Sequence, residues 1–374
     1  MKNIPFSSPD IQESEIDAVN DVIRSGWLAH GEFSQKLEQL FCEYTGAKYA
    51  TTVSNCTAGL HLSCLASNFG QGDEVIVPAQ THTATAHAIE FTGAKAVFAD
   101  VDLVTGNILI EEVRKKISSK TKGIIPVHMA GYPCNMDSIK TICEENNLIL
   151  IEDCAHAMGT MFDKKHAGNF GITGCFSFYP TKQITTGEGG MVISNDENTI
   201  EKIKKLKAFG IDTPPEMRKK PGVYDVQELG YNYRMTDIQA ALGVGQMERY
   251  AINVENRRKN AQLYCDLLKD RDGIYFTTYT ENNSYFLFQI FFSDSLIRNK
   301  ILLSLKEEKI GTSIHYATPV PLMSYYKNKY GYRPSDFPNA VQYGSSNISL
   351  PVHQYLKEEQ IEDICRTIIY NLEN

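Results

Sequence analysis

The sequence CFSFYPTKQITTGEGGMVISND, residues 175–196, decides the fold that we expect for this chain. It is typical of a strand over 175–179, a polar loop, and a second strand over 191–194. The loop holds one lysine, Lys182, among hydroxyl side chains and glycines, and glycine allows the backbone to approach a ligand closely. Such a lysine can hold a phosphate or form a Schiff base with a carbonyl compound. A surface hairpin whose lysine faces water would have the same pattern.

The composition limits the classes of protein to which the chain can belong. Its 374 residues suit a large domain with a smaller one. The net charge is -8 and no basic run occurs, which argues against nucleic-acid binding. The nine cysteines form no CxxC pair, so we expect buried free thiols and no metal site. Without an apolar stretch for a signal peptide or a membrane span, we expect a cytoplasmic protein.

From residue 48 onward, short apolar strands alternate with helices. This alternation predicts a mostly parallel sheet that is covered by helices on both faces. Ligands in such sheets bind at the carboxyl ends of the strands. The expected strands are 49–53, 74–78, 94–101, 123–128 and 148–153, and the expected helices are 58–66, 83–91, 110–117 and 135–146. The polar groups at their ends are 54–57, 80–82, His128, Asp153 with His156, and 177–182.

Two of these strand ends indicate a particular chemistry. The turn 54–57 leads from a strand into a helix, and free N–H groups at a helix N-terminus attract an anion. An ordinary helix N-cap is an equally good interpretation, and both can hold at once. Asp153 closes a buried strand, where a carboxylate needs a partner. A cationic ring nitrogen would serve, but these residues alone favour a salt bridge or a helix cap.

The remaining sequence predicts a second, smaller domain. The Pro- and Lys-rich loop 209–224 is long enough for a lid or a subunit contact. We expect a large domain over 1–248 and a small one over 249–374, linked by a long helix. The other expected elements are helices 10–25, 33–44, 197–208, 238–247, about 250–269, 295–309 and 358–372, strands 285–292 and 312–315, and a Tyr- and Pro-rich loop 319–338.

Several motifs, in a fixed order, make a family resemblance specific. They are SGWLAHG (25–31), VSNCTAGLHL (53–62), GDEVIVPAQTHTATAHAIEFTGA (72–94), VHMAGYPCNMD (127–137), IEDCAHAMG (151–159), FSFYPTKQITTGEGGMV (176–192), GYNYRMTDIQAALG (230–243), IHYATPVP (314–321) and LPVH (350–353). Over nearly its full length the chain resembles the DegT/DnrJ/EryC1/StrS family of pyridoxal-phosphate-dependent sugar aminotransferases. The resemblance implies an α/β chain with the type I fold of aspartate aminotransferase. That fold has a mostly parallel mixed sheet flanked by helices and a smaller α+β C-terminal domain.

The resemblance also implies roles for single residues. Lys182 would be the Schiff-base lysine and proton shuttle, and Asp153 would pair with the protonated pyridine nitrogen of the cofactor. The backbone N–H near Cys56, together with Thr57 and Ser177, would hold the phosphate. Asn232 would reach the phosphate of the neighbouring subunit. The resemblance therefore implies a homodimer with active sites at the subunit interface.

Two histidines depart from the usual family pattern. His82 stands where many members have an aromatic residue stacked on the cofactor ring. His156 stands where many have Gln, next to the phenolic oxygen, so that its tautomer matters. The family pattern also indicates four substrate contacts, although a core histidine explains His315 equally well. These contacts are Trp27, Tyr179, His315 and Tyr316.

The activity implied by the resemblance is transfer of an amino group from L-glutamate, with the cofactor passing through pyridoxamine phosphate. The acceptor would be a keto sugar, usually a nucleotide-linked (deoxy)hexulose for surface polysaccharide or glycan synthesis. A smaller phosphorylated ketone is an alternative acceptor. A related class, the sugar 3-dehydratases, carries His in place of Lys182, so the lysine argues for transamination. The acidic charge argues against a DNA-binding regulator, and an assay would separate an enzyme from an inactive cofactor-binding scaffold.

Overall fold

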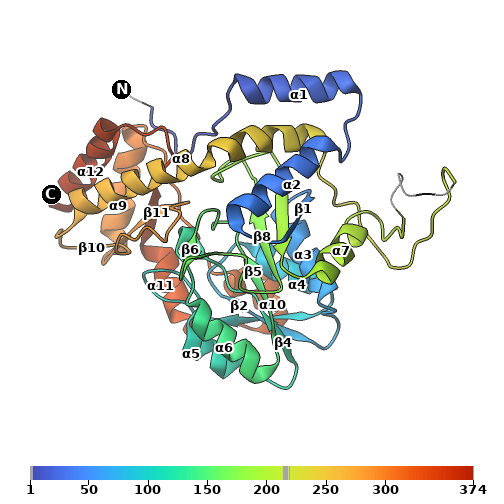
Figure 1. Ribbon diagram of the computed structural model, residues 1–374. Helices are drawn as coiled ribbons and strands as arrows, with labels where there is room; N and C mark the ends of the chain where they lie inside the picture. The colour runs from blue at the N-terminus through green and yellow to red at the C-terminus, as the bar shows by residue number, and fades with distance from the viewer. Residues whose placement is uncertain (1–2, 214–217, 219, 374) are drawn as a thin grey trace.

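The computed structural model describes residues 3–213, 218 and 220–373, and a seven-stranded sheet lies at its centre (Figure 1). The strand order is β1-β9-β8-β5-β4-β2-β3, and only β9 runs antiparallel to its neighbours. The expected mostly parallel sheet is thus confirmed. Its strands are β1 (Tyr49–Val53), β2 (Glu74–Pro78), β3 (Lys95–Ala99), β4 (Thr121–Ile124), β5 (Ile149–Asp153), β8 (Thr173–Ser177) and β9 (Gly190–Ser194).

Helices cover both faces of this sheet. In β2, Val75 and Val77 pack in one core with α3, α4 and α7, whereas Ile76 packs in another core with α5 and α6. Because alternate side chains are buried on opposite faces, the strands are continuous apolar runs. The helices are α2 (Glu32–Thr45), α3 (Cys56–Ala66), α4 (Thr83–Glu90), α5 (Ile110–Lys116), α6 (Met136–Asn146) and α7 (Glu197–Leu206). Apart from them, α1 (Glu13–Ser25) packs on α8.

A second core forms around a small antiparallel sheet near the C-terminus. Its strands are β10 (Ile274–Tyr275), β11 (Phe288–Phe292) and β12 (Asn347–Leu350), with α9 (Ser295–Glu307) and α12 (Glu358–Glu373) packed beside them. Ile4, from the start of the chain, is also buried in this core. A small hairpin, β6 (Met161–Phe162) and β7 (Lys165–His166), leads towards β8.

One helix, α8 (Asp237–Leu268), extends from a core beside the large sheet to the C-terminal core (Figure 1). It packs against α1 and α2 at one end and against α12 at the other. The prediction of two helices, 238–247 and about 250–269, was therefore wrong. The sequence between them contains no proline or other strong helix breaker, so the hydrogen bonding continues. The predicted boundary between residues 248 and 249 falls inside α8, and the division into two domains stays a prediction.

Two predictions in the C-terminal region were also wrong. Residues 312–315 form no strand, because their only ladder contact is a single bridge between Ser313 and Ser349. The predicted loop 319–338 contains a helix, whose buried Tyr326 holds it against the sheet layer. Tyrosine has no strong helix preference, so burial and not propensity decides this segment. Its elements are η3 (Val320–Leu322), α10 (Ser324–Tyr330) and η4 (Pro334–Asp336), followed by α11 (Pro338–Ser346).

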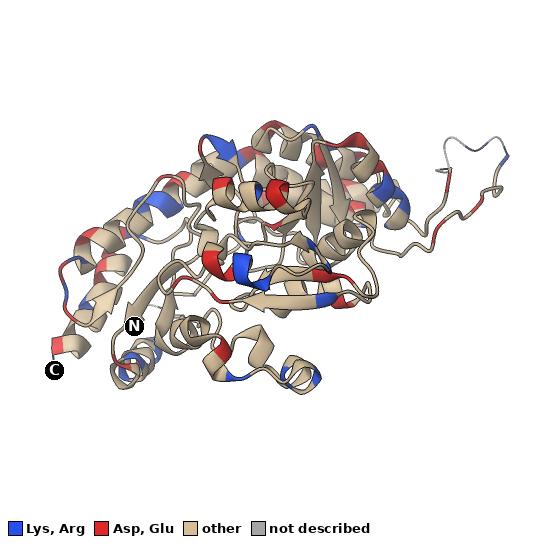
Figure 2. Ribbon diagram, turned by 90° about the horizontal axis from the view of Figure 1, so that it is seen from below, with Lys and Arg blue, Asp and Glu red and all other residues tan. Residues whose placement is uncertain are grey.

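Figure 2 shows acidic and basic residues spread together over the helices and loops. None of the described helices combines the length and apolar content that a bilayer span requires.

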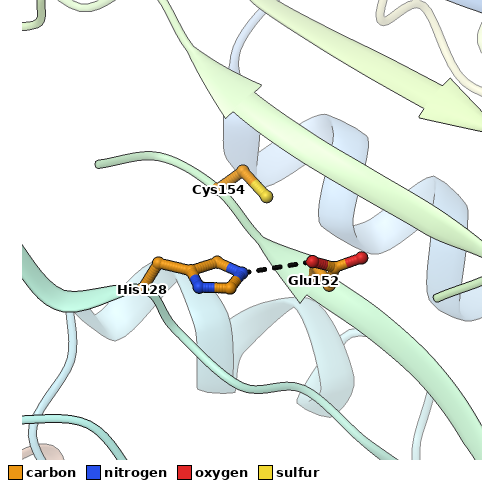
Figure 3. Close-up of side chains that lie close together, drawn as sticks. All are labelled: His128, Glu152 and Cys154. Atoms are coloured by element: carbon orange, nitrogen blue, oxygen red, sulfur yellow. Dashed lines mark hydrogen bonds and ion pairs between the residues drawn. The ribbon is translucent and has the colours of Figure 1, made fainter. Parts of the chain in front are cut away.

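A buried glutamate connects the central strand to the segment that precedes β8. Glu152 is completely buried, and its carboxylate accepts hydrogen bonds from the backbone N–H groups of 168, 170 and 171 at 2.6–2.8 Å. His128 lies 3.1 Å away through Nε2, with Cys154 close by (Figure 3). The N–H of Cys134 donates to Nδ1 of His128, so the proton on Nε2 points at Glu152. Each carboxylate oxygen thus accepts two hydrogen bonds, and the group acts as a structural tie.

We expect Glu152→Gln to lower the melting temperature of the protein by about 4 °C. One side-chain oxygen becomes an NH₂ group, so two buried donors lose their acceptor, at a cost of roughly 3 kcal/mol or more. A thermal melt followed by circular dichroism measures this change. Glu145→Gln, which breaks only the exposed ion pair with Arg114, is the matched control and should shift stability by less than about 0.5 kcal/mol. Equal melting temperatures for the two variants would contradict the assignment of a structural tie.

Candidate active site

A cavity of about 700 Å³ lies at the carboxyl ends of the sheet strands, next to the loop that carries Lys182. The loop connects β8 and β9, as the sequence predicted, although β8 begins two residues earlier than expected. Of the twelve predicted site residues, ten line this cavity. They are Cys56, Thr57, His82, Asp153, His156, Ser177, Tyr179, Lys182, His315 and Tyr316.

The first turn of α3 forms one end of the cavity. Asn55 caps the helix by accepting a hydrogen bond from the N–H of Ala58, and Cys56 and Thr57 follow. Gly190 packs directly on this turn, because a Cβ there would lie 2.8 Å from the backbone N of Cys56. With the helix dipole and the free N–H groups of its first turn, this end suits an anion. The two interpretations of this turn, N-cap and anion site, are therefore compatible.

Lys182 also lines the cavity. Its Nζ lies 4.1 Å from the centre of the Phe286 ring. Removal of the amine from water lowers the pKa of Lys182 to about 8, although Cys56 and Asp153 counteract this shift. Gln246 of α8 fixes the loop, because its side chain bonds both the N–H and the C=O of Thr185. The geometry therefore presents a lysine with a substantial neutral fraction near pH 8.

Asp153 faces the cavity from the end of β5 and is only 3% exposed. Its Oδ2 accepts a hydrogen bond from the hydroxyl of Thr85 (2.7 Å), and its Oδ1 accepts one from the N–H of Ala155 (3.0 Å). No described lysine, arginine or histidine forms an ion pair with it. The local sequence favoured a salt bridge or a helix cap, and the described part of the chain forms no salt bridge with Asp153. The carboxylate retains acceptor capacity that a cationic ligand atom can use.

The two histidines that depart from the family pattern both line the cavity. His82 caps α4 by accepting the N–H of Ala84, and its ring lies edge-on to Tyr316 at 5.9 Å. Burial, with a further contribution from Lys182, lowers the pKa of His82. His156 is stacked on Phe286 with ring centres 4.3 Å apart, and burial lowers the pKa of His156 well below 6.5. Both imidazoles are therefore neutral at pH 7.

The four predicted substrate contacts differ in where they lie relative to the cavity. Tyr179 lies at the rim of the cavity and is 47% exposed, while Tyr316 is deeper. His315 bonds Ser349 through Nδ1 at 3.0 Å, and burial lowers the pKa of His315 to about 3. His315 thus both packs in the interior and lines the cavity. Trp27, at 63% exposure, donates its ring N–H to the C=O of His30 and does not reach the cavity.

Asn232 likewise lies on the surface and outside the cavity of its own chain. The segment that follows it is tied to the loop after Trp27 by Asp237. The N–H of Asp237 donates to the C=O of Leu28, and its carboxylate accepts the N–H groups of Gly31 and Ser34. Neither Asn232 nor Trp27 is among the residues that line the cavity of Lys182.

The sequence did not indicate three residues that shape the site. Phe286 covers Lys182 and His156, yet its apolar surroundings in the sequence are those of any core residue. Thr85 orients Asp153, and Gln246 holds the lysine loop from a helix far along the chain. Thr85 lies inside a quoted motif, whereas no local pattern could reveal the contacts of Phe286 or Gln246.

The arrangement fits pyridoxal phosphate. An amine suits an aldehyde, a helix N-terminus suits a phosphate, and an unpaired carboxylate suits a protonated pyridine nitrogen. All three groups line one cavity, whose volume falls in the range of small-molecule sites.

Comparisons with known proteins agree with this chemistry. The model of the DegT/DnrJ/EryC1/StrS aminotransferase family matches residues 9–369. GDP-perosamine synthase of Escherichia coli O157:H7 is 36% identical, over 98% of each chain, and the spore coat polysaccharide biosynthesis protein SpsC of Bacillus subtilis is 34% identical, over 98% of this chain and 96% of that protein. The putative sugar aminotransferase Spr1654 from Streptococcus pneumoniae in its PMP form superposes with a TM-score of 0.93, at 30% identity over 99% of each chain. The same protein in its PLP form gives a TM-score of 0.92.

With a lysine, a carboxylate and a helix N-terminus around one cavity and with these similarities over almost its whole length, the chain belongs to the DegT/DnrJ/EryC1/StrS aminotransferase family and is a pyridoxal-phosphate-dependent sugar aminotransferase.

Proposed function

We propose that this enzyme transfers the amino group of L-glutamate to a nucleotide-linked keto sugar, for the synthesis of a surface polysaccharide or glycan. The observation that carries the proposal is the cavity of about 700 Å³ in which Lys182 and Asp153 face the same space. The names of two relatives support the acceptor, since one refers to a GDP-linked amino sugar and the other to a polysaccharide. A smaller phosphorylated ketone is the alternative acceptor. Lys182 disfavours the sugar dehydratases, which carry His there.

The residues proposed to hold the cofactor surround it from several elements. Thr57, Ser177 and the N–H groups at Cys56 would bind the phosphate, and Asp153 would pair with the ring nitrogen. His82 and His156, which line the cavity, would lie beside the ring. When bound, pyridoxal phosphate supplies an aldehyde that takes up the amino group and a ring that withdraws electrons from the reacting carbon.

The chain itself contributes positioning and proton transfer. In its neutral form Lys182 attaches the cofactor and, once released, takes a proton from the Cα of the amino donor. Thr85 and the N–H of Ala155 keep the carboxylate of Asp153 in one orientation. The ring of Phe286, on which His156 is stacked, covers one side of the lysine and shields that side from water.

We further propose a homodimer in which Asn232 of each chain completes the partner's site. The exposed position of Asn232, away from its own cavity, supports this arrangement. We also propose a cytoplasmic location, since all nine cysteines are unpaired and eight of them are buried.

The proposed reaction has a direct spectroscopic test. The purified protein should absorb in the visible region because of bound pyridoxal phosphate, and L-glutamate should convert this band to that of pyridoxamine phosphate. A panel of nucleotide-linked keto sugars and small keto phosphates should then restore the first band with one class of acceptor. Recovery only with keto phosphates would establish the alternative acceptor. No response to L-glutamate would contradict the proposed donor.

The lowered pKa of Lys182 predicts how cofactor attachment depends on pH. An ammonium group has no lone pair, so attachment to the cofactor-free protein should be slow below the pKa and should rise with pH. We expect a midpoint of about 8, compared with about 10.4 for an ordinary lysine. Stopped-flow absorbance between about pH 6 and pH 10 measures it. A midpoint near 10 would show that the lysine is not desolvated. Lys182→Ala is the control and should give no covalent adduct by mass spectrometry after borohydride reduction.

Mixed dimers test the role proposed for Asn232. Lys182→Ala and Asn232→Ala chains, each inactive alone, should regain about a quarter of wild-type activity when co-expressed. Half of the dimers then carry both chains, and one of their two sites has an intact lysine and an intact asparagine. The matched control is Lys182→Ala with Asp153→Ala, since both residues line the cavity of one chain and no mixed site is intact. Recovery in neither pair would mean that Asn232 acts within its own chain or that no dimer forms.

A further inference from the structure

A strained residue begins a row of hydrogen bonds that crosses one wall of the cavity. Ala130, within the short turn η1 (Met129–Gly131), has φ = 57°, a left-handed conformation that residues with a side chain rarely adopt. Leu287 holds it there by donating its N–H to the C=O of Ala130. Gly131 packs so closely on Ser284 that a Cβ would lie 2.5 Å from the hydroxyl oxygen. The strained turn is therefore fixed by the segment that carries Phe286.

The turn directs its backbone N–H at one nitrogen of His156. The N–H of Ala130 donates to Nδ1 over 3.3 Å. Since a backbone N–H only donates, Nδ1 accepts and cannot carry a proton. The ring is buried and stacked on Phe286, and no described carboxylate forms an ion pair with it. Burial, with Lys182 close by, favours the neutral ring, whose single proton must then lie on Nε2.

The protonated nitrogen faces the hydroxyl of Tyr316. Nε2 of His156 lies 3.3 Å from this oxygen, so the imidazole donates and the tyrosine accepts. The backbone of Tyr316 is held by Gln80, whose side chain donates to its C=O over 2.6 Å. Burial and the charge of Asp153 raise the pKa of Tyr316, so that its hydroxyl stays protonated. Because His156 occupies a lone pair, the tyrosine's own proton is available for a third partner.

We propose that Tyr316 is a fixed hydrogen-bond donor to the keto oxygen of the acceptor sugar, and that His156 is the positioning residue that sets its direction. The identity of the acceptor rests on the proposed function, whereas the direction of the hydrogen bonds does not. A keto oxygen can accept this bond, but the ammonium group of the aminated product cannot. The arrangement therefore favours the keto sugar over its product in the same position.

The direction of the hydrogen bonds from Ala130 through His156 to Tyr316 is tested first, by a measurement that does not require turnover. Nitrogen-15 NMR of histidine-labelled, full-length holoenzyme, with His156→Gln to assign the signal, should show His156 neutral and protonated on Nε2. A proton on Nδ1, or a doubly protonated ring near neutral pH, would overturn the proposal. This result is independent of the acceptor. If no keto sugar accepts an amino group, the proposed function fails while the direction of the hydrogen bonds is still decided.

Kinetics then test the role of the hydroxyl. Tyr316→Phe should raise the KM for the acceptor about tenfold and weaken the preference for keto over amino sugar. His156→Leu should have a similar effect, and the double variant should be no worse than either single one. His156→Gln should restore binding, because an amide can accept from Ala130 and donate to Tyr316. Tyr264→Phe, which removes a buried hydroxyl bonded to the C=O of Pro351 in the C-terminal core, is the control and should leave KM unchanged.

Two kinetic results would overturn the proposal. Additive losses in the double variant would mean that His156 and Tyr316 act separately. A shifted absorption band of the bound cofactor in Tyr316→Phe would mean that the hydroxyl donates to the cofactor and not to the sugar.

Discussion

Two adjacent carboxylates at the end of β5 impose opposite requirements on the structure around them. The pleat of the strand directs Glu152 and Asp153 to opposite faces. Glu152 accepts four hydrogen bonds from a histidine and three backbone N–H groups, so its charge is compensated inside the protein. Asp153 accepts only two and faces the cavity. An isolated buried carboxylate is energetically costly. Asp153 therefore has a negative charge that a cationic ligand can compensate.

The surroundings of Lys182 favour its uncharged form. Its amine lies against an aromatic face, where the neutral form is favoured and where an aldehyde can react. The same cavity is lined by a helix N-terminus that needs no side-chain charge to attract an anion. The three groups come from three different connections of the sheet, and they meet because parallel strands end at the same edge. Binding of the cofactor would therefore relieve unsatisfied polar groups as well as equip the enzyme for its reaction.

The sequence predicted most of what depends on local pattern. The strands of the large sheet and the loop of Lys182 could be inferred because burial on both faces leaves continuous apolar runs between polar ends. Of the twelve site residues that the family motifs indicated, ten line one cavity. Contacts made through the tertiary structure could not be inferred. Phe286, Gln246 and the strained turn at Ala130 owe their roles to packing between segments far apart in the chain. The helix α10 was missed for the same reason, since its buried Tyr326 packs on Phe98 and bonds His87, which lie far away in the sequence.

The unbroken helix α8 has a mechanical consequence. Its N-terminal half fixes the lysine loop through Gln246, and its C-terminal half is buried in the core that also contains Phe288 and Leu350. A helix of 32 residues without proline is stiff over about 48 Å. One wall of the cavity carries Lys182, and the other is continuous with the C-terminal sheet. Both walls are thus attached to the same rigid helix. The continuous helix therefore opposes rotation of one wall against the other.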